Sequence, residues 1–211
     1  MKNLKWIIII IVIIVVAGAF AFWLGAKKGI GPGERQTEES AQVSKPEETK
    51  PEIKYATFTY DQGRFSFEYP DGWIKIAPEE IEKALTEEGR QKEKVLFYAS
   101  NTEGVIISAG LEDHAQGDKS LDGLIEESLA ELKKADPDMT IFADERKGNE
   151  VSLGIDFRTQ GRDWSNIGKI ILAETKETDH FYSVAITLPK ELRDKYYDVG
   201  AYVLNSVRIQ Y

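Results

Sequence analysis

Cysteine is absent from the 211 residues of this chain, and histidine occurs only twice. Without cysteine the protein cannot form disulfides, a thiolate zinc site or a cysteine nucleophile, and it cannot carry a lipid on an N-terminal cysteine. A domain of this composition that works outside the cytosol must therefore be held together by its hydrophobic core alone.

Catalytic sequence motifs are also missing. The chain has no Gly-x-Ser-x-Gly or Ser-x-x-Lys pattern, and its glycines are scattered rather than grouped into a phosphate-binding loop. The two histidines, His114 and His180, lack the spacing of HxH or HExxH metal motifs. We predict no catalytic residue, no metal site and no cofactor, and we expect both histidines in surface turns.

Acidic residues outnumber basic ones beyond the N-terminus. The formal net charge is −9, although the first 28 residues carry four lysines and no acidic residue, so the remainder is strongly acidic. Nucleic-acid binding depends on Lys and Arg replacing condensed counterions, and here the field has the wrong sign. The sequence therefore predicts no nucleic-acid partner.

One long hydrophobic run is present near the N-terminus. Residues 6–24 contain no charged or strongly polar side chain, and as a helix they span about 28 Å, close to the hydrocarbon core of a bilayer. Trp6 and Trp23 stand at the ends of the run, where aromatic rings prefer the headgroup layer. We predict that residues 1–28 form a membrane anchor, with membrane contact through residues 6–24.

A cleaved signal peptide is the alternative, because Ala19-Phe20-Ala21 resembles a small-x-small cleavage site. The hydrophobic run continues past that site through Leu24, which favours an uncleaved signal anchor. Two lysines lie on each side of the run, so the charge balance hardly determines which way the span is oriented in the membrane. The short N-terminal tail favours a single-pass protein of the cell membrane whose large domain lies outside the cytoplasm.

Residues 29–54 are predicted to be an extended polar linker. The segment contains Gly31-Pro32-Gly33 and two copies of Lys-Pro-Glu, and it has few hydrophobic side chains to bury. A segment of this kind cannot offset its chain entropy by folding, and its proline and charge make it semi-stiff.

Residues 55–211 are predicted to form one soluble domain, in which hydrophobic residues alternate with polar ones from residue 64 onward. Turn residues at Asp61-Gln62-Gly63 predict a hairpin between two strands. The expected strands are Ala56–Tyr60, Arg64–Tyr69, Trp73–Ile76, Lys94–Ser100, Val105–Leu111, Thr140–Glu145, Glu150–Thr159, Asn166–Thr175 and His180–Leu188.

Helices are predicted between runs of strands rather than between every pair. One begins at Pro78 and another covers Ser120–Ala135, with a hydrophobic stripe at helical spacing. A last helix begins at Pro189 and has Leu192, Tyr196, Val199 and Val203 as its buried stripe. This arrangement indicates an α+β fold with an antiparallel β-sheet packed between helices, preceded by one transmembrane helix.

Two segments resemble the PsbP-like family. Residues 64–73, RFSFEYPDGW, are similar to the opening strand, Pro-Gly turn and tryptophan of that family, and Phe181–Pro189 followed by Asn205–Ile209 resembles its last strand, helix and closing strand. The resemblance covers Tyr55–Tyr211 and implies the fold that PsbP shares with Mog-type proteins. It also implies a non-catalytic, protein-binding accessory domain.

Trp164 is the candidate partner-binding anchor. It is expected in a loop, Gln160–Ser165, beside Arg162 and just after Arg158, and Trp and Arg dominate the energetics of protein interfaces. The alternative is that Trp164 folds back over the edge of the sheet.

Three functions remain open at this level. The first is a membrane-anchored accessory or binding domain with a protein partner. The second is a small-ligand-binding protein, which requires a deep apolar pocket between sheet and helix. The third is a hydrolase that uses carboxylates with His114 or His180, which requires a concave pocket that holds at least one of these histidines.

Overall fold

The computed structural model describes residues 53–81 and 94–210. The predicted membrane helix, nearly all of the linker and most of the helix expected from Pro78 lie outside these residues. The strands are β1 (Tyr55–Tyr60), β2 (Phe65–Pro70), β3 (Ile74–Lys75), β4 (Lys94–Ser100), β5 (Ile106–Ala115), β6 (Thr140–Lys147), β7 (Glu150–Thr159), β8 (Arg162–Glu174), β9 (Thr178–Pro189) and β10 (Arg208–Ile209). The helices are α3 (Leu121–Ala135) and α4 (Arg193–Asn205), and short 3-10 turns cover Asp61–Gly63 and Lys190–Leu192.

A seven-stranded antiparallel sheet forms the centre of the described domain, in the order β3-β4-β5-β9-β8-β7-β6. β4–β5, β6–β7, β7–β8 and β8–β9 are neighbours in sequence and in space, as the short predicted turns require. The pairing of β5 with β9 is non-local and joins these hairpins into one sheet. The predicted antiparallel sheet is confirmed.

The turn between β7 and β8 is shorter than predicted. Gln160 and Gly161 have φ values of 52° and 77°, and two consecutive positive φ angles are typical of a two-residue type I′ hairpin turn. Pairing of β7 with β8 therefore begins at once, with Thr159 opposite Arg162 and Phe157 opposite Trp164. The expected loop Gln160–Ser165 was wrong, because the tight turn draws Trp164 into a strand.

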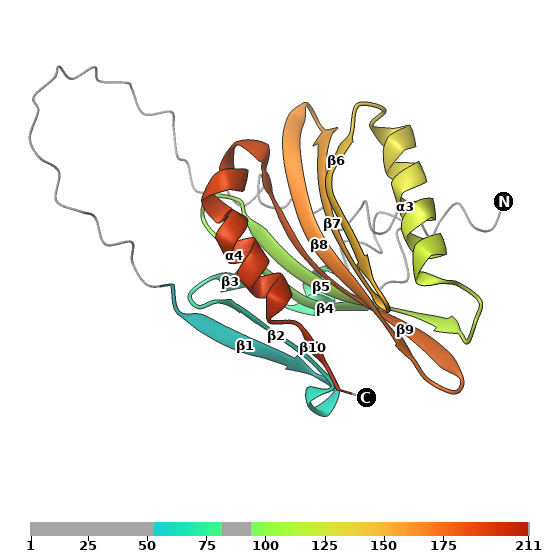
Figure 1. The fold of residues 1–211 in the computed structure, drawn as a ribbon. Coiled ribbons are helices and arrows are strands. Elements are labelled where there is room, and N and C mark those ends of the chain that lie inside the picture. The colour runs from blue at the N-terminus through green and yellow to red at the C-terminus, as the bar shows by residue number, and fades with distance from the viewer. Residues whose placement is uncertain (1–52, 82–93, 211) are drawn as a thin grey trace, which may run out of the picture.

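A second, three-stranded sheet was not predicted. The hairpin β1–β2, which was predicted, does not join the large sheet but pairs with the closing strand in the order β1-β2-β10. β10 lies antiparallel to β2, with Arg208 opposite Ser66. The C-terminus of the described chain therefore returns to its beginning, as Figure 1 shows.

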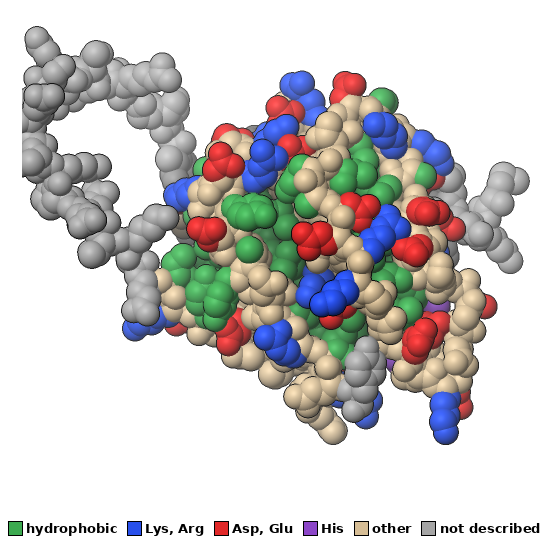
Figure 2. All heavy atoms as spheres, in the orientation of Figure 1, with side chains coloured by type: hydrophobic (Ala, Val, Ile, Leu, Met, Phe, Trp, Pro, Cys, Tyr) green, Lys and Arg blue, Asp and Glu red, His purple; other side chains and the backbone are tan. Residues whose placement is uncertain are grey.

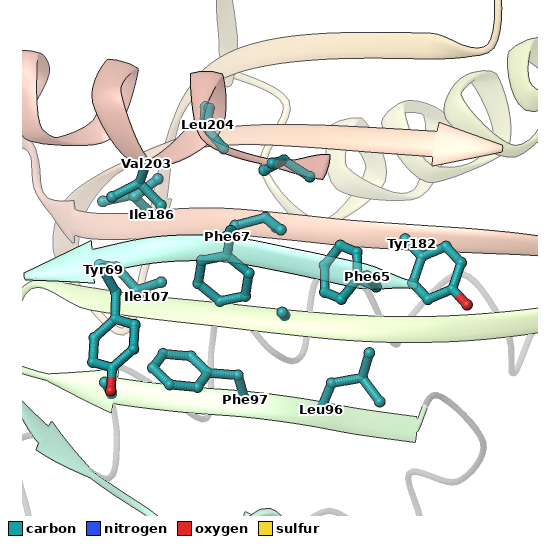
Figure 3. Packing of buried hydrophobic residues seen from close by; sticks show 14 of the residues in the cluster. Phe65, Phe67, Tyr69, Leu96, Phe97, Ile107, Tyr182, Ile186, Val203 and Leu204 are labelled. Atoms are coloured by element: carbon teal, nitrogen blue, oxygen red, sulfur yellow. The ribbon is translucent and has the colours of Figure 1, made fainter. Parts of the chain in front are cut away.

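α4 and the small sheet cover one face of the large sheet (Figure 1). Inward side chains of β2 pack against α4 and against β4, β5 and β9, and the ring of Phe65 stacks on Tyr182 at 4.8 Å (Figure 3). Phe67 lies edge-on to Phe97 at 5.2 Å. Burial of such aromatic rings is a main source of the stability of the fold.

α3 covers the opposite face. Its predicted stripe is confirmed, since Leu121, Leu124, Ile125, Ser128 and Leu132 are all buried. The N-cap Ser120 accepts a hydrogen bond from the Gly123 N–H, as expected for a helix that begins at this serine.

The α+β arrangement is thus confirmed for the described residues, with a helix on one face of the sheet and a helix plus a small sheet on the other. No helix within residues 53–81 and 94–210 is both long and apolar enough to cross a membrane. The predicted span, residues 6–24, lies outside them.

Candidate functional site

Trp164 lies in the core beneath α3 and not on a loop tip. Its side chain is 5% exposed and packs with Leu132, Met139 and Phe157. The ring covers a face of the sheet from the inner strand β8, and it does not fold back over the sheet edge from a loop. The guanidinium of Arg162 lies 5.2 Å from the Trp164 ring centroid, so the indole contributes to the surface only through the arginine that covers it.

Arg158 and Arg162 are both exposed at the β7–β8 turn. Arg158 lies 3.7 Å from Asp163, and Arg162 donates a 3.2 Å hydrogen bond to Glu191 at the start of the 3-10 turn. The two predicted arginines are thus brought together at one end of the sheet, while Trp164 is buried below them.

A buried carboxylate, Asp156, organises this end of the domain. It accepts hydrogen bonds from the Ser165 hydroxyl at 2.5 Å and from Arg193 Nη1 at 2.8 Å, and it lies 2.9 Å from Lys190 Nζ. Asp156 is on β7 and Ser165 is its cross-strand partner on β8, whereas the two cations come from the connection into α4. The cluster therefore fixes the start of α4 against the sheet.

Two opposing effects act on the pKa of Asp156. Burial raises it, and the hydrogen bond from Ser165 together with the charges of Lys190 and Arg193 lowers it. The net pKa lies below the ordinary value for aspartate, so Asp156 is ionised near neutral pH.

An aromatic ring extends the cluster to the edge of the sheet. The Arg193 guanidinium lies 4.8 Å from the centroid of Phe142, which is on the edge strand β6 and is 38% exposed. The ring lies directly over Gly154, where any Cβ would overlap it. Gly154 is thus required for close approach of the Phe142 ring.

Hydrophobic exposure continues along this edge at Ile141, the neighbour of Phe142. Among the described strands β6 pairs only with β7, so its outer edge is unpaired. Figure 2 shows Lys and Arg side chains interleaved with Asp and Glu along the upper rim of the face that carries α4, with hydrophobic side chains below them. We call Arg158, Arg162, Arg193, Ile141 and Phe142 the arginine–phenylalanine surface.

Sequence reasoning missed most of this surface. An aspartate in the middle of a strand, on the side opposite to the hydrophobic residues, looks in the sequence like an ordinary solvent-facing residue. The only available signal was the basic composition of Lys190 and Arg193 just after a strand. Which carboxylate they meet, 37 residues away for Arg193, depends on the tertiary fold.

A separate cavity of about 80 Å³ lies between α3 and the large sheet. Its roof is apolar and includes Leu124, Ile125 and Leu132 of α3, while its floor contains small residues such as Gly168 and Ala185. Six polar residues also line it, namely Ser108, Glu112, Ser128, Asn166, Lys169 and Ser183. It lies where the small-ligand hypothesis requires a pocket, between the sheet and a helix.

The two histidines do not meet. On the paired strands β5 and β9, His114 lies opposite Asp179 and His180 lies opposite Asp113. The two pairs are adjacent in register, so the two histidine side chains lie on opposite faces of the sheet. His114 Nε2 lies 2.6 Å from Glu112, and His180 Nδ1 lies 2.6 Å from Asp113. Both side chains are partly buried rather than in open surface turns, because each packs beside its carboxylate.

No protein-family model and no curated protein matches this chain in sequence. Among solved structures, LpqN of Mycobacterium tuberculosis, which is involved in cell envelope biogenesis, is similar with a TM-score of 0.51 and 12% identity over 76% of this chain and 92% of LpqN. The PsbP protein CyanoP of Synechocystis sp. PCC 6803 gives a TM-score of 0.52 and 11% identity over 80% of this chain and 99% of CyanoP.

These identities are low, so the likeness concerns the fold. The described domain has the PsbP/Mog-like fold that the two sequence segments resemble. The segments that carried the resemblance correspond to β2 with its Pro-Asp-Gly turn and to β9, α4 and β10.

Proposed function

We propose that this protein is a membrane-anchored accessory module that binds a protein partner outside the cytoplasm through the arginine–phenylalanine surface. The observation that carries the proposal is the contact of Arg193 with the exposed ring of Phe142, which neighbours the exposed Ile141 on β6. Arginine and aromatic side chains are the residue types that most often dominate binding energy at protein interfaces.

The geometry of the surface favours a preformed binding site. Arg193 is held from below by Asp156 and from the side by Phe142, so little side-chain entropy is lost when it meets a partner. The unpaired edge of β6 adds backbone donors and acceptors that an extended segment can use.

The membrane part of the proposal rests on the sequence. Residues 6–24 are long enough for one span, and the polar residues 29–54 separate that span from the folded domain. The similarity of fold to LpqN, a protein of cell envelope biogenesis, agrees with a domain that acts at an envelope.

Crosslinking of the full-length protein in native membranes, followed by mass spectrometry, tests the proposal. We expect one recurrent partner, with crosslinks that map to β6, to the β7–β8 turn and to the start of α4. Charge reversal at Arg158→Glu together with Arg162→Glu should abolish its capture, because both side chains are exposed there.

The matched control reverses two lysines away from this surface. Lys54→Glu and Lys176→Glu change the charge by the same amount on exposed residues outside β6, the β7–β8 turn and the start of α4. Equal loss of the partner in both double variants would assign the effect to net charge and overturn the proposed surface.

A second candidate, binding of a small apolar ligand, is favoured by the cavity under α3. Xenon or a short alkane should occupy an apolar cavity of this size, and occupancy is measurable by the chemical shift of bound ¹²⁹Xe. Gly168→Ala is the filling variant, since its added methyl would meet Ala185 Cβ at an ordinary 3.6 Å. Xenon binding that is unchanged in this variant would remove the cavity as a ligand site.

A further inference from the structure

A second concave region lies at the opposite end of the sheet from the arginine–phenylalanine surface. This cleft has a volume of about 540 Å³ and is formed by the start of α3, the turn between β6 and β7, and the ends of β5, β8 and β9. The charged residues that line it are Lys119, Asp122, Arg146, Glu174 and Asp179.

Asp179 in the wall of this cleft has an unmatched oxygen. The residue is 4% exposed, and its Oδ2 accepts a hydrogen bond from the Gly117 N–H at 2.8 Å. Its Oδ1 is buried and accepts no hydrogen bond from any residue that the structure describes. A buried carboxylate oxygen without a donor is unfavourable, so a donor supplied by a ligand would stabilise this position.

Glu174 adds a second carboxylate at the same place. It lies directly opposite Asp179 in the β8–β9 pair, and directly opposed residues project from the same face of a sheet. Like charges in opposed positions destabilise a sheet. Within the described part of the chain Glu174 forms no ion pair, and its side chain is exposed at the rim.

The cations that line the cleft are already engaged elsewhere. Lys119 lies 2.7 Å from Glu127, and Arg146 lies 2.7 Å from Asp122 and 3.1 Å from Asp144. Neither compensates Asp179 or Glu174 in this arrangement. The negative potential of the opposed carboxylates therefore remains available to a ligand.

The chemistry of the site favours an N–H donor over a metal ion. No group of three or more acidic or histidine side chains among the described residues is placed to hold a metal. An ammonium group carries one positive charge and three donors, and it can satisfy both Asp179 Oδ1 and an exposed carboxylate that moves toward it.

We propose that this cleft binds a primary ammonium group, carried by a small amine or by a lysine side chain, between Asp179 and Glu174. The ammonium enters past the rim at Glu174, whose exposed side chain can move aside, and donates to the buried Oδ1. The cleft and the arginine–phenylalanine surface lie at opposite ends of β9, so the two proposals can fail separately.

The test is an NMR titration of the full-length protein in detergent with n-butylammonium chloride at neutral pH. We expect saturable shifts of the Gly117 and Asp179 amides at millimolar amine. Butanol and tetramethylammonium should bind at least about tenfold more weakly, because the first lacks the charge and the second lacks the N–H donors.

Two variants localise the binding. Asp179→Asn and Glu174→Gln should each weaken n-butylammonium binding about tenfold. Since Glu174 is exposed, Glu174→Gln should fold normally and keeps the test valid even if Asp179→Asn folds poorly. Asp118→Asn is the matched control, a nearby exposed acid that does not line the cleft. Binding that is absent, equal for butanol, or lost equally in Asp118→Asn would overturn the proposal.

Discussion

Replacement of Asp156 should be among the most damaging single changes outside the hydrophobic core. The carboxylate is 7% exposed and binds the hydroxyl of Ser165, which is fully buried, together with Lys190 and Arg193. Asp156→Asn retains one acceptor for Ser165 but removes the charge that both cations face. Asp156→Ala removes the acceptor as well.

The magnitudes follow from these contacts. Removal of one partner of a fully buried ion pair costs about 3–5 kcal/mol. Lys190 and Arg193 have side chains that are 46% and 31% exposed and can turn to water, so we expect a smaller loss of about 1–2 kcal/mol for Asp156→Asn. Asp156→Ala should cost about 3 kcal/mol, since it also leaves the buried Ser165 hydroxyl without its acceptor.

Urea unfolding followed by tryptophan fluorescence measures both values, with the slope of the free energy of unfolding against urea required to stay constant. Asp163→Asn is the control, because Asp163 is an exposed partner of Arg158 at 3.7 Å and should change stability by less than about 0.5 kcal/mol. If Asp156→Asn and Asp163→Asn had equal effects, the argument that Asp156 anchors the start of α4 would be refuted.

Three further predictions use the same unfolding assay. Because the pKa of Asp156 is lowered in the fold, its contribution to stability is complete above the ordinary aspartate pKa of about 3.9 and is lost as pH falls through the folded value. The difference in the free energy of unfolding between wild type and Asp156→Asn should therefore narrow below about pH 4. A difference that stays constant down to about pH 2 would contradict this. Trp164→Ala should cost about 3–5 kcal/mol through loss of core packing, whereas a surface anchor would leave stability unchanged. Gly154→Ala should lower the free energy of unfolding by about 1–3 kcal/mol and reduce partner capture, because the added methyl displaces the Phe142 ring. Unchanged capture would show that Phe142 is not part of the binding surface.

The local elements could be predicted because their causes are local. The stripe of α3 follows from hydrophobic residues at helical spacing, and its first residue follows from the N-cap Ser120. The alternation along β7 correctly placed Val151 and Phe157 on one buried face. The hairpin of β1 with β2 followed from its turn residues.

The position of Trp164 shows where local reasoning stopped. Gln160-Gly161 is as compatible with the middle of a loop as with a two-residue turn, and only strand pairing distinguishes the two. A register that starts at Thr159 and Arg162 puts Trp164 under α3, so a residue that looked like an interface anchor became part of the core. Arg158 and Arg162 lie together at the exposed β7–β8 turn.

The sequence by itself determined the periodic elements, the α+β class, the acidic character of the domain and the hydrophobic run at residues 6–24, since each depends on residues close together in the chain. The tertiary structure alone decided the second sheet, the meeting of Asp156 with Arg193 and the opposition of Glu174 and Asp179. These features depend on strand register and on non-local pairing, which bring together side chains whose own neighbourhoods carry no sign of one another.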